Sequence, residues 1–325
     1  MEKAVRNLAE LGQQLTTSED LREEIKCAVR KNPWFIEPFV QHAVDAVLNE
    51  MLNEPKLKEW LKPYELRAVN KTIGLIFAGN IPLVGFHDFM CCYVAGSKMK
   101  IKLSSKDDAL FLFMLKALSE IDADINERVE IVDTLKNFDA VIATGSDNTN
   151  RYFEYYFRDY PKILRKNRNS VAIINGEETE EDLAKLADDI FLYFGFGCRN
   201  VSKLYVPVGY NFEKLFPAFE SYKWLHTHNK YMNNYDYQRT LLLMNSIQHL
   251  SNDYIMLREH ASIASPIATL HYEFWHDENV LNAHLKRNEE KIQCIISKNN
   301  FGTAQHPSLS DYADGVDSMK FLLSL

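Results

Sequence analysis

Residues 72–103 read TIGLIFAGNIPLVGFHDFMCCYVAGSKMKIKL, and this stretch decides the fold. TIGLIFA (72–78) is a short apolar run of the kind that forms a buried strand. LVGFHDFMCCYVAG (83–96) is typical of a helix, and KMKIKL (98–103) of a second strand. A strand, a helix and a strand of these lengths predict a parallel βαβ unit.

The same alternation continues along the rest of the chain. Helices are expected at 107–121, 148–158, 180–194, 211–225, 231–249 and 278–287, and strands at 129–133, 139–144, 170–174, 203–208, 266–274 and 292–297. This pattern predicts an α/β fold with two doubly wound domains and an active site in the cleft between them. Residues 2–63 have a helical pattern instead, with Asn32 as a predicted N-cap and Pro33 as the first residue of a helix.

Composition excludes several classes of protein. The net charge is −8 and the basic residues are scattered, so we expect no nucleic-acid partner. No apolar stretch reaches the roughly 20 residues needed to cross a membrane, and the N-terminus lacks the apolar core of a signal peptide. The five cysteines lack zinc-type spacing and no histidine pattern fits a metal site, so we expect reduced thiols, a cytoplasmic protein and no metal.

The segment GFGCRNVSKLYVP (195–207) places Cys198 in a glycine-containing turn between a helix and a strand. Glycines let a substrate approach closely, and a turn thiol becomes a nucleophile where its environment favours the thiolate. The alternative is that Cys198 is a small buried apolar residue. A dinucleotide fingerprint is rejected, because Asn200 replaces the third glycine and a strand follows the turn.

This segment resembles the nucleophile segment of the aldehyde dehydrogenase superfamily, in which G-x-G-C is followed by K-L-Y-V. FAGNIPLVG (77–85), KIKLSSKDD (100–108) and ATGSDNTN (143–150) are similar to further segments of that superfamily, in the same order. The narrower resemblance is to the acyl-CoA reductases of the bacterial bioluminescence type, which belong to fatty acid reductase systems. FGFGCRNVSKLYVP and GTAQHPSLSDYADGVD carry it, and it covers about residues 70–325.

The resemblance implies a domain division and a reaction. Residues 1–176 would hold the N-terminal helices and the dinucleotide-binding domain, 177–300 the catalytic domain, and 301–325 a loop and helix that pack back over the cleft. Cys198 would attack the thioester carbonyl, coenzyme A would leave, and hydride would reduce the acyl-enzyme to an aldehyde. Asn80 and the backbone N–H of Cys198 would stabilise the oxyanion. Taken without the other matches, Asn80 is typical of a turn residue before Ile81 and Pro82.

The resemblance also assigns cofactor-binding residues. Lys102 would bind the adenosine ribose, with Ser104 beside it, although a lysine at a strand end is commonly just solvated. Ser105 stands where the family often has a glutamate that repels a 2′-phosphate, which favours NADPH over NADH. Thr144, Gly145 and Ser146 would face the pyrophosphate, and the alternative for Ser146 is a plain helix N-cap, a role that Asp147 could also fill.

Two departures from the superfamily concern the chemistry. Hydrolytic members use a glutamate some thirty residues before the cysteine to activate water, but KILRKNRNSVAII (162–174) contains no acid. ASIASP (261–266) stands where a glutamate usually holds the nicotinamide ribose, so Ser262 or a neighbour would have to replace it. The missing base favours an acyl-enzyme relieved by hydride or coenzyme A over one relieved by water.

His306, in the loop expected over the cleft, is a candidate proton donor, and the alternative is a surface histidine without a role. The predicted function is NADPH-dependent reduction of an acyl-CoA, with a fatty acyl group suggested by the family. An acyl-activating synthetase is the predicted partner. Two alternatives stay open: reduction of an acyl phosphate by the same cysteine chemistry, and a non-catalytic scaffold for an acyl-activating partner.

Overall fold

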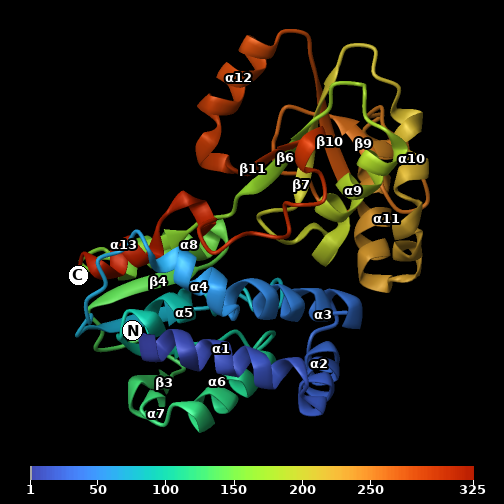
Figure 1. Ribbon diagram of the computed structural model, residues 1–325. Helices are drawn as coiled ribbons and strands as arrows, with labels where there is room; N and C mark the ends of the chain where they lie inside the picture. Colours follow the sequence, from blue (N-terminus) through green and yellow to red (C-terminus); the bar gives the residue numbers. More distant parts are fainter. Residues whose placement is uncertain (1) are drawn as a thin grey trace. The chain divides into compact units, whose positions relative to one another are not determined.

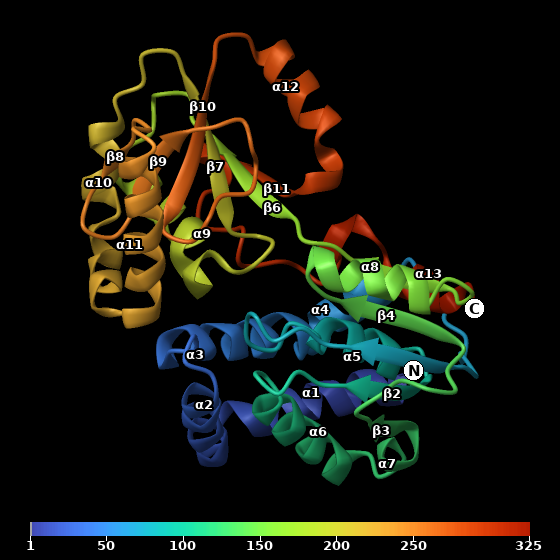
Figure 2. The same cartoon turned by 180° about the vertical axis from the view of Figure 1, so that it is seen from behind.

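The computed structural model describes residues 2–325, which form two compact units (Figures 1 and 2). Unit 1 comprises residues 2–167 together with Ser308–Leu325, and unit 2 comprises Arg168–Pro307. The boundary between the units lies before the strand at 169–173, whereas the predicted domain boundary was after residue 176. The reason is that this strand pairs with two strands of unit 2.

The N-terminal helices are α1 (Glu2–Thr16), α2 (Glu19–Lys31), α3 (Glu37–Ala46), η1 (Val47–Met51) and α4 (Glu54–Leu61). α1 buries Leu8, Leu11 and Leu15 on one face, and both α1 and α2 pack against α6 (Ala109–Ile121). The prediction that Asn32 and Pro33 open a helix is wrong. Asn32 is the C-cap of α2 in an extended conformation, because a residue before proline avoids the helical region.

Unit 1 contains a parallel sheet of five strands in the order β3-β2-β1-β4-β5. The strands are β1 (Thr72–Ile76), β2 (Lys98–Lys102), β3 (Val129–Ile131), β4 (Ala140–Thr144) and β5 (Lys162–Arg165). Crossovers run through α5 (Phe86–Val94), α6, α7 (Ile125–Arg128) and α8 (Asp147–Tyr156). The apolar run at 72–78 does form the central strand, since Ile73 and Leu75 are fully buried. The α/β prediction is confirmed.

Unit 2 contains a six-stranded sheet in the order β11-β6-β7-β10-β9-β8, parallel except for the short β8. The strands are β6 (Asn169–Ile173), β7 (Val201–Pro207), β8 (Leu250–Ser251), β9 (Met256–Glu259), β10 (Thr269–Trp275) and β11 (Ile292–Ser297). The helices are α9 (Glu180–Phe191), α10 (Leu215–Ala218), α11 (Asn229–Met244) and α12 (Glu278–Arg287). The sequence did not predict β5, β8 or β9.

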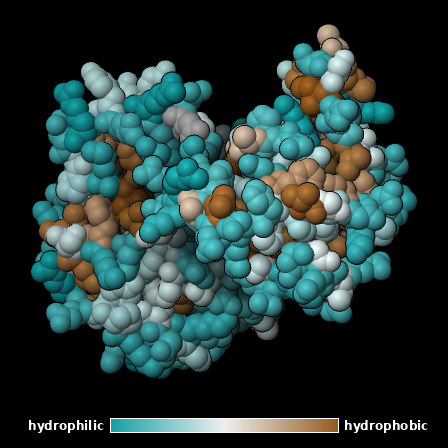
Figure 3. Space-filling view, turned by 90° about the horizontal axis from the view of Figure 1, so that it is seen from above, coloured by the Kyte–Doolittle hydropathy of each residue, from teal (hydrophilic) through white to brown (hydrophobic). Residues whose placement is uncertain are grey.

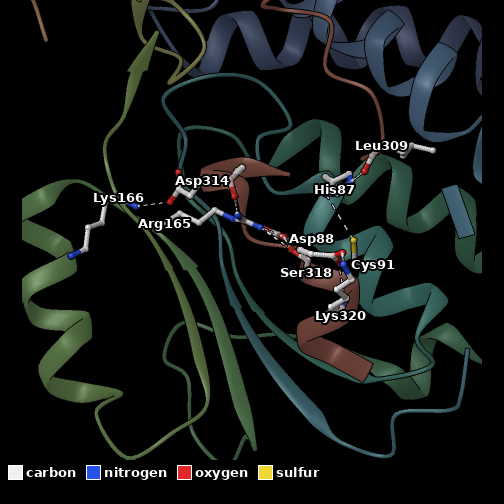
Figure 4. A network of polar contacts seen from close by, with 11 residues as sticks. His87, Asp88, Cys91, Arg165, Lys166, Leu309, Asp314, Ser318 and Lys320 are labelled. Atoms are coloured by element: carbon white, nitrogen blue, oxygen red, sulfur yellow. Dashed lines mark hydrogen bonds and ion pairs between the residues drawn. The ribbon is translucent and has the colours of Figure 1, made fainter. Parts of the chain in front are cut away.

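The segment after residue 307 ends in α13 (Ser318–Leu323), which packs on α5 of unit 1. Figure 4 shows the buried contacts that hold it. The Arg165 guanidinium pairs with Asp88, donates to the Ala313 carbonyl and contacts Ser318 Oγ at 2.9 Å. Burial would raise the pKa of Asp88, but the Arg165 charge outweighs burial and lowers it. This ion pair therefore ties the C-terminal segment to unit 1.

Among the helices of residues 2–325, none combines the length and the apolar character that a membrane span requires. On the face drawn in Figure 3, hydrophobic side chains form separate groups among hydrophilic ones.

Candidate functional site

Three neighbouring strands of unit 1 end at the same level. Lys102, the last residue of β2, lies opposite Ile76 of β1, and Ile76 lies opposite Ala143 of β4. Lys102 and Thr144 thus end the strands on the two sides of β1. The sheet order reverses between β1 and β4, and in open α/β sheets ligands bind beside the carboxyl ends of the strands at such a point.

Asn80 lies in the loop after β1, where its side chain is exposed. Two buried side chains hold this loop. Asn32 donates to the carbonyls of Gly79 and Lys106, at 3.5 and 3.3 Å, and Asp107 accepts the N–H of Leu83 at 2.8 Å. The loop therefore has a fixed course on both sides of Asn80.

Gly79 allows two loops to approach closely. A Cβ at this position would lie 2.4 Å from Ser104 Oγ, which is shorter than real contacts. Ser104 is half-buried, and its Oγ also accepts the N–H of Lys106 at 3.3 Å, whereas Ser105 is exposed. The β1 and β2 loops thus form one surface that presents Asn80, Lys102 and Ser105.

Asp107 is 8% exposed, and its second oxygen, Oδ1, has no hydrogen-bond partner among the described residues. Burial raises the pKa of this carboxyl to about 7, although the Leu83 N–H opposes the shift. No sequence pattern identifies this group, because Asp107 occupies an ordinary position at the start of a predicted helix.

Ser146 is the N-cap of α8, where its Oγ accepts the N–H of Thr149 at 3.3 Å. Ser146 is thus the cap, and its hydroxyl oxygen is already used as a hydrogen-bond acceptor. The N-terminus of α8 still favours the binding of anions. Gly145 is held by α8, because its carbonyl accepts a hydrogen bond from the Asn150 side chain at 3.1 Å. A Cβ at this position would lie 2.9 Å from the Phe153 ring, so the site has no room for a side chain.

Cys198 lies in unit 2 on a turn between the end of α9 and β7, and its side chain is half-buried. The N–H of Asn200 donates to the Gly197 carbonyl at 3.0 Å, which closes the turn. The Cys198 carbonyl accepts from Ser170 Oγ at 3.1 Å. Before the turn, Tyr193 and Phe194 have positive φ angles of 54° and 58°, which are costly for residues other than glycine. The chain therefore reaches Cys198 through a strained reversal that the surroundings hold in place.

His306 is also in unit 2 and is exposed. Its N–H donates to the Thr303 carbonyl at 2.9 Å. The loop before it is held by Asp189 of α9, whose carboxylate accepts the N–H groups of Gly302 at 2.6 Å and Ala304 at 2.9 Å. The same α9 residue supplies the carbonyl that accepts from the Asn200 side chain at 3.2 Å. Asp189 thus contacts both the Cys198 turn and the loop that leads to His306.

ASIASP (261–266) is fixed through its backbone. Three successive carbonyls, those of residues 261–263, accept from Lys203 Nζ, His271 Nδ1 and Ser202 Oγ, at 2.9, 2.9 and 2.7 Å. The Ser262 hydroxyl donates within the loop to the Ala264 carbonyl. Within residues 2–325, no group of three or more histidine, cysteine or acidic side chains could hold a metal ion.

The structure therefore brings the predicted residues together in two sets. Asn80, Lys102, Ser104, Ser105 and Thr144 to Ser146 lie at the carboxyl ends of β1, β2 and β4 in unit 1. Cys198 and His306 lie in unit 2, on segments that share Asp189. Sequence reasoning missed Asp189, although a carboxylate on the apolar face of the predicted helix at 180–194 was a usable signal.

The family model for acyl-CoA reductase (LuxC) matches residues 5–213, which is more than half of the chain. The chain belongs to this acyl-CoA reductase family. The match includes the N-terminal helices, so the LuxC likeness begins well before residue 70, where the sequence resemblance was expected to start.

Solved aldehyde dehydrogenase structures share the fold. A putative aldehyde dehydrogenase from Burkholderia cenocepacia is similar with a TM-score of 0.68 and 13% identity, over 92% of this chain and 79% of that one. Aldehyde dehydrogenase 21 from Physcomitrella patens has a TM-score of 0.65 and 12% identity, over 99% and 83%. An NAD-dependent benzaldehyde dehydrogenase from Corynebacterium glutamicum has a TM-score of 0.66 and 12% identity, over 93% and 83%. A search of curated proteins finds no match.

Proposed function

We propose that this chain reduces a fatty acyl-CoA to the aldehyde with NADPH, through a thioester on Cys198. The observation that carries the proposal is the turn of Cys198, a half-buried thiol in a turn whose Gly197 and Cys198 carbonyls both accept hydrogen bonds. Membership of the LuxC family supports reduction at the acyl or aldehyde level. The identity of the substrate, the choice of NADPH and the covalent intermediate are parts of our proposal.

In the proposed first step, the Cys198 thiolate attacks the thioester carbonyl and the bond to coenzyme A sulfur breaks. Coenzyme A leaves as a thiolate and takes up a proton, and the acyl group stays on Cys198. Asn80 and the Cys198 N–H would donate to the oxyanion that forms during this exchange. His306 is the proposed donor of the proton.

The bound reduced nicotinamide would supply a hydride, which is two electrons, to the acyl carbon. Collapse of the resulting thiohemiacetal then releases the aldehyde and restores the Cys198 thiolate. The sum is one acyl-CoA, one NADPH and one proton converted to one aldehyde, one coenzyme A and one NADP⁺. The scheme assigns the nucleophile to unit 2 and the cofactor-binding residues to unit 1.

The residues at the carboxyl edge of the unit 1 sheet fit a dinucleotide. The order β3-β2-β1-β4-β5 supplies the reversal beside which such ligands bind, and the N-terminus of α8 supplies backbone N–H groups for a pyrophosphate. A side chain at position 79 would collide with Ser104, so Gly79 lets the loops after β1 and β2 pack closely at this edge. Lys102 and Ser104 would hold the ribose, and Thr144, Gly145 and Ser146 would face the phosphates.

The segment in which hydrolytic members of the superfamily carry their base has no acid in this chain. Residues 162–174, which comprise β5, β6 and their connection, contain no acidic side chain. An acyl-enzyme on Cys198 would therefore persist until hydride or coenzyme A removes it. This supports acyl-CoA reduction over oxidation of an aldehyde to an acid.

The experiment is a panel of acyl-CoA thioesters of increasing chain length, assayed for aldehyde with NADPH and with NADH. We expect aldehyde with NADPH, a preference for long chains and no activity in Cys198→Ala. Full activity of Cys198→Ala would overturn the covalent step. Acyl phosphates in the same assay test the second candidate substrate, and unselective labelling of Cys198 by iodoacetamide together with no turnover would favour a scaffold.

Ser105 carries the proposed preference for NADPH. Ser105→Glu would place a carboxylate where the 2′-phosphate binds, so we expect the ratio of kcat/KM for NADPH to that for NADH to fall by about tenfold or more. Ser105→Gln adds similar bulk without charge and is the matched control. An acyl-activating synthetase is the proposed partner, and faster turnover on adding one with free fatty acid and ATP would support it.

A further inference from the structure

We infer that Asn200 is a positioning residue that aims the backbone N–H of Cys198 at the oxyanion, with Ser170 fixing the peptide on the other side. This inference rests on the proposed function, because it concerns the same thiol and the same intermediate. It adds two residues that make no contact with the substrate in the scheme above.

Asn200 is 1% exposed and braces the turn twice. Its side-chain Oδ1 accepts the N–H of Gly197 at 2.8 Å, and its own N–H donates to the carbonyl of Gly197 at 3.0 Å. The Gly197 carbonyl and the Cys198 N–H belong to one planar, trans peptide and point in opposite directions. The backbone N–H of Asn200 therefore fixes the direction in which the Cys198 N–H points, and the Asn200 side chain holds the preceding peptide through the Gly197 N–H.

The amide nitrogen of Asn200 ties this turn to the helix before it. Nδ2 lies within hydrogen-bond distance of the carbonyls of Asp189 at 3.2 Å, Ile190 at 3.3 Å and Leu192 at 2.8 Å. The last carbonyls of a helix lack partners within the helix, so a side chain that satisfies several of them fixes the helix end. The strained residues Tyr193 and Phe194 lie between that end and the turn.

Ser170 of β6 fixes the peptide that follows Cys198. It is fully buried, and its Oγ donates to the Cys198 carbonyl and accepts the N–H of Cys294, each at 3.1 Å. Its own N–H donates to the Asn200 carbonyl at 3.0 Å. The peptides on both sides of Cys198 thus depend on Asn200 and Ser170, and through them on α9, β6 and β11.

A pair of reactions separates this role from general support of the fold. Attack on a thioester develops an oxyanion and needs the Cys198 N–H, whereas alkylation by iodoacetamide involves the same sulfur without an oxyanion. A change that misaims the N–H alone slows the first reaction and spares the second. A change that only loosens unit 2 alters both reactions together.

The experiment measures both rates at Cys198 in the full-length chain. Acylation is followed as release of coenzyme A from a long-chain acyl-CoA without NADPH, and alkylation by mass spectrometry of the Cys198 peptide. Losing one oxyanion donor typically costs about 10²- to 10³-fold, so we expect acylation in Asn200→Ala to fall about 10²-fold while alkylation changes less than about threefold. For Ser170→Ala we expect about a tenfold loss of acylation.

Asn200→Asp keeps the acceptor for the Gly197 N–H but removes the donor to the helix end, so its acylation rate should lie between wild type and Asn200→Ala. Asn7→Ala is the matched control, because Asn7 is also a buried asparagine, bonded to Tyr93 in unit 1. If Asn200→Ala does not fold, Asn200→Asp and Ser170→Ala carry the test. Equal losses in both reactions, or unchanged acylation, would overturn the inference.

A wrong substrate assignment would give a different result from a wrong role for Asn200. If no acyl-CoA acylates wild-type Cys198, the substrate assignment is wrong, and a p-nitrophenyl ester then replaces acyl-CoA because its carbonyl needs the same N–H. The contrast between ester attack and alkylation in the variants still decides the role of Asn200.

Discussion

The carboxylate of Asp189 accepts the backbone N–H of Gly302 at 2.6 Å, across 113 residues of sequence. Ala304 donates to the other oxygen, so one buried side chain on α9 holds the loop at 301–306. Asp189 is fully buried, and burial raises the pKa of its carboxyl to about 6. The loop that carries His306 is therefore attached to the helix that precedes Cys198.

Asp189→Ala should release this loop. A hydrogen bond to a charged group contributes about 1.5–3 kcal/mol, so amide exchange at Gly302 and Ala304 should become at least about tenfold faster. Hydrogen-exchange mass spectrometry measures it. Asp188→Ala is the control, since Asp188 is exposed and bonds Tyr222 instead. Unchanged exchange at both amides would show that Asp189 does not hold the loop.

Asp107→Asn should stabilise the chain at alkaline pH and have little effect in acid. The folded pKa of about 7 lies above the ordinary value of 3.8, so the contribution of Asp107 to stability is complete below about pH 4 and is lost as the pH rises through 7. Asparagine keeps an acceptor for the Leu83 N–H without a buried charge. We expect a gain of roughly 1–3 kcal/mol at pH 8 in the free energy of unfolding, measured with urea.

The corresponding change at the neighbouring half-buried acid, Asp108→Asn, would not produce this pH dependence, although it would lose the ion pair with Lys31. A gain in Asp107→Asn of equal size at pH 4 and pH 8 would contradict the assignment of a raised pKa.

Breaking the buried pair of Arg165 and Asp88 should be costly. Removal of one partner leaves an uncompensated buried charge, so Arg165→Met should lower the free energy of unfolding by roughly 3–5 kcal/mol, and Arg165→Met with Asp88→Leu by less. Lys166 and Glu154 form an exposed ion pair in the same unit, and Lys166→Met should cost about 0–1 kcal/mol. Urea unfolding curves give the free energy of unfolding of wild type and of the three variants. An equal loss of this free energy in Arg165→Met and Lys166→Met would contradict the prediction.

Gly79→Ala should destabilise unit 1 through contact with Ser104. The added methyl would lie 2.4 Å from Oγ and 2.8 Å from Cβ of Ser104, and such overpacking typically costs about 1–3 kcal/mol. Thermal unfolding measures the loss. Ser104→Gly in the same chain removes both atoms and should recover part of it, whereas Ser104→Ala leaves the Cβ contact and should recover less. No recovery in either double variant would place the strain elsewhere.

The elements that could be predicted from the sequence are those whose own residues are apolar enough to indicate burial. β1 and β2 alternate with a helix in which nearly every side chain is buried, and the apolar pattern alone locates them. β5 was missed because its sequence, KILR, reads as basic. Arg165 is nevertheless buried, and what permits this is Asp88, which lies 77 residues earlier in the chain.

The candidate site divides in the same way. The turn of Cys198 was predictable from its glycines, and the ends of β2 and β4 from their strands. The side chains that hold these loops were not, because the partners of Asn200 and Asp107 are backbone groups whose positions exist only after folding. Asn32 was misread as a helix start, although it ends α2 and reaches the loop after β1.

Unit 1 is made from two parts of the chain, and this has a consequence for the order of events on the ribosome. Residues 2–167 are synthesised first, but Met319 and Leu322, which are fully buried in the same core, follow only after all of unit 2. Domains generally fold as their residues emerge. Unit 2 can therefore finish folding before unit 1, and the nascent unit 1 must leave the surface of α5 uncovered until translation reaches α13.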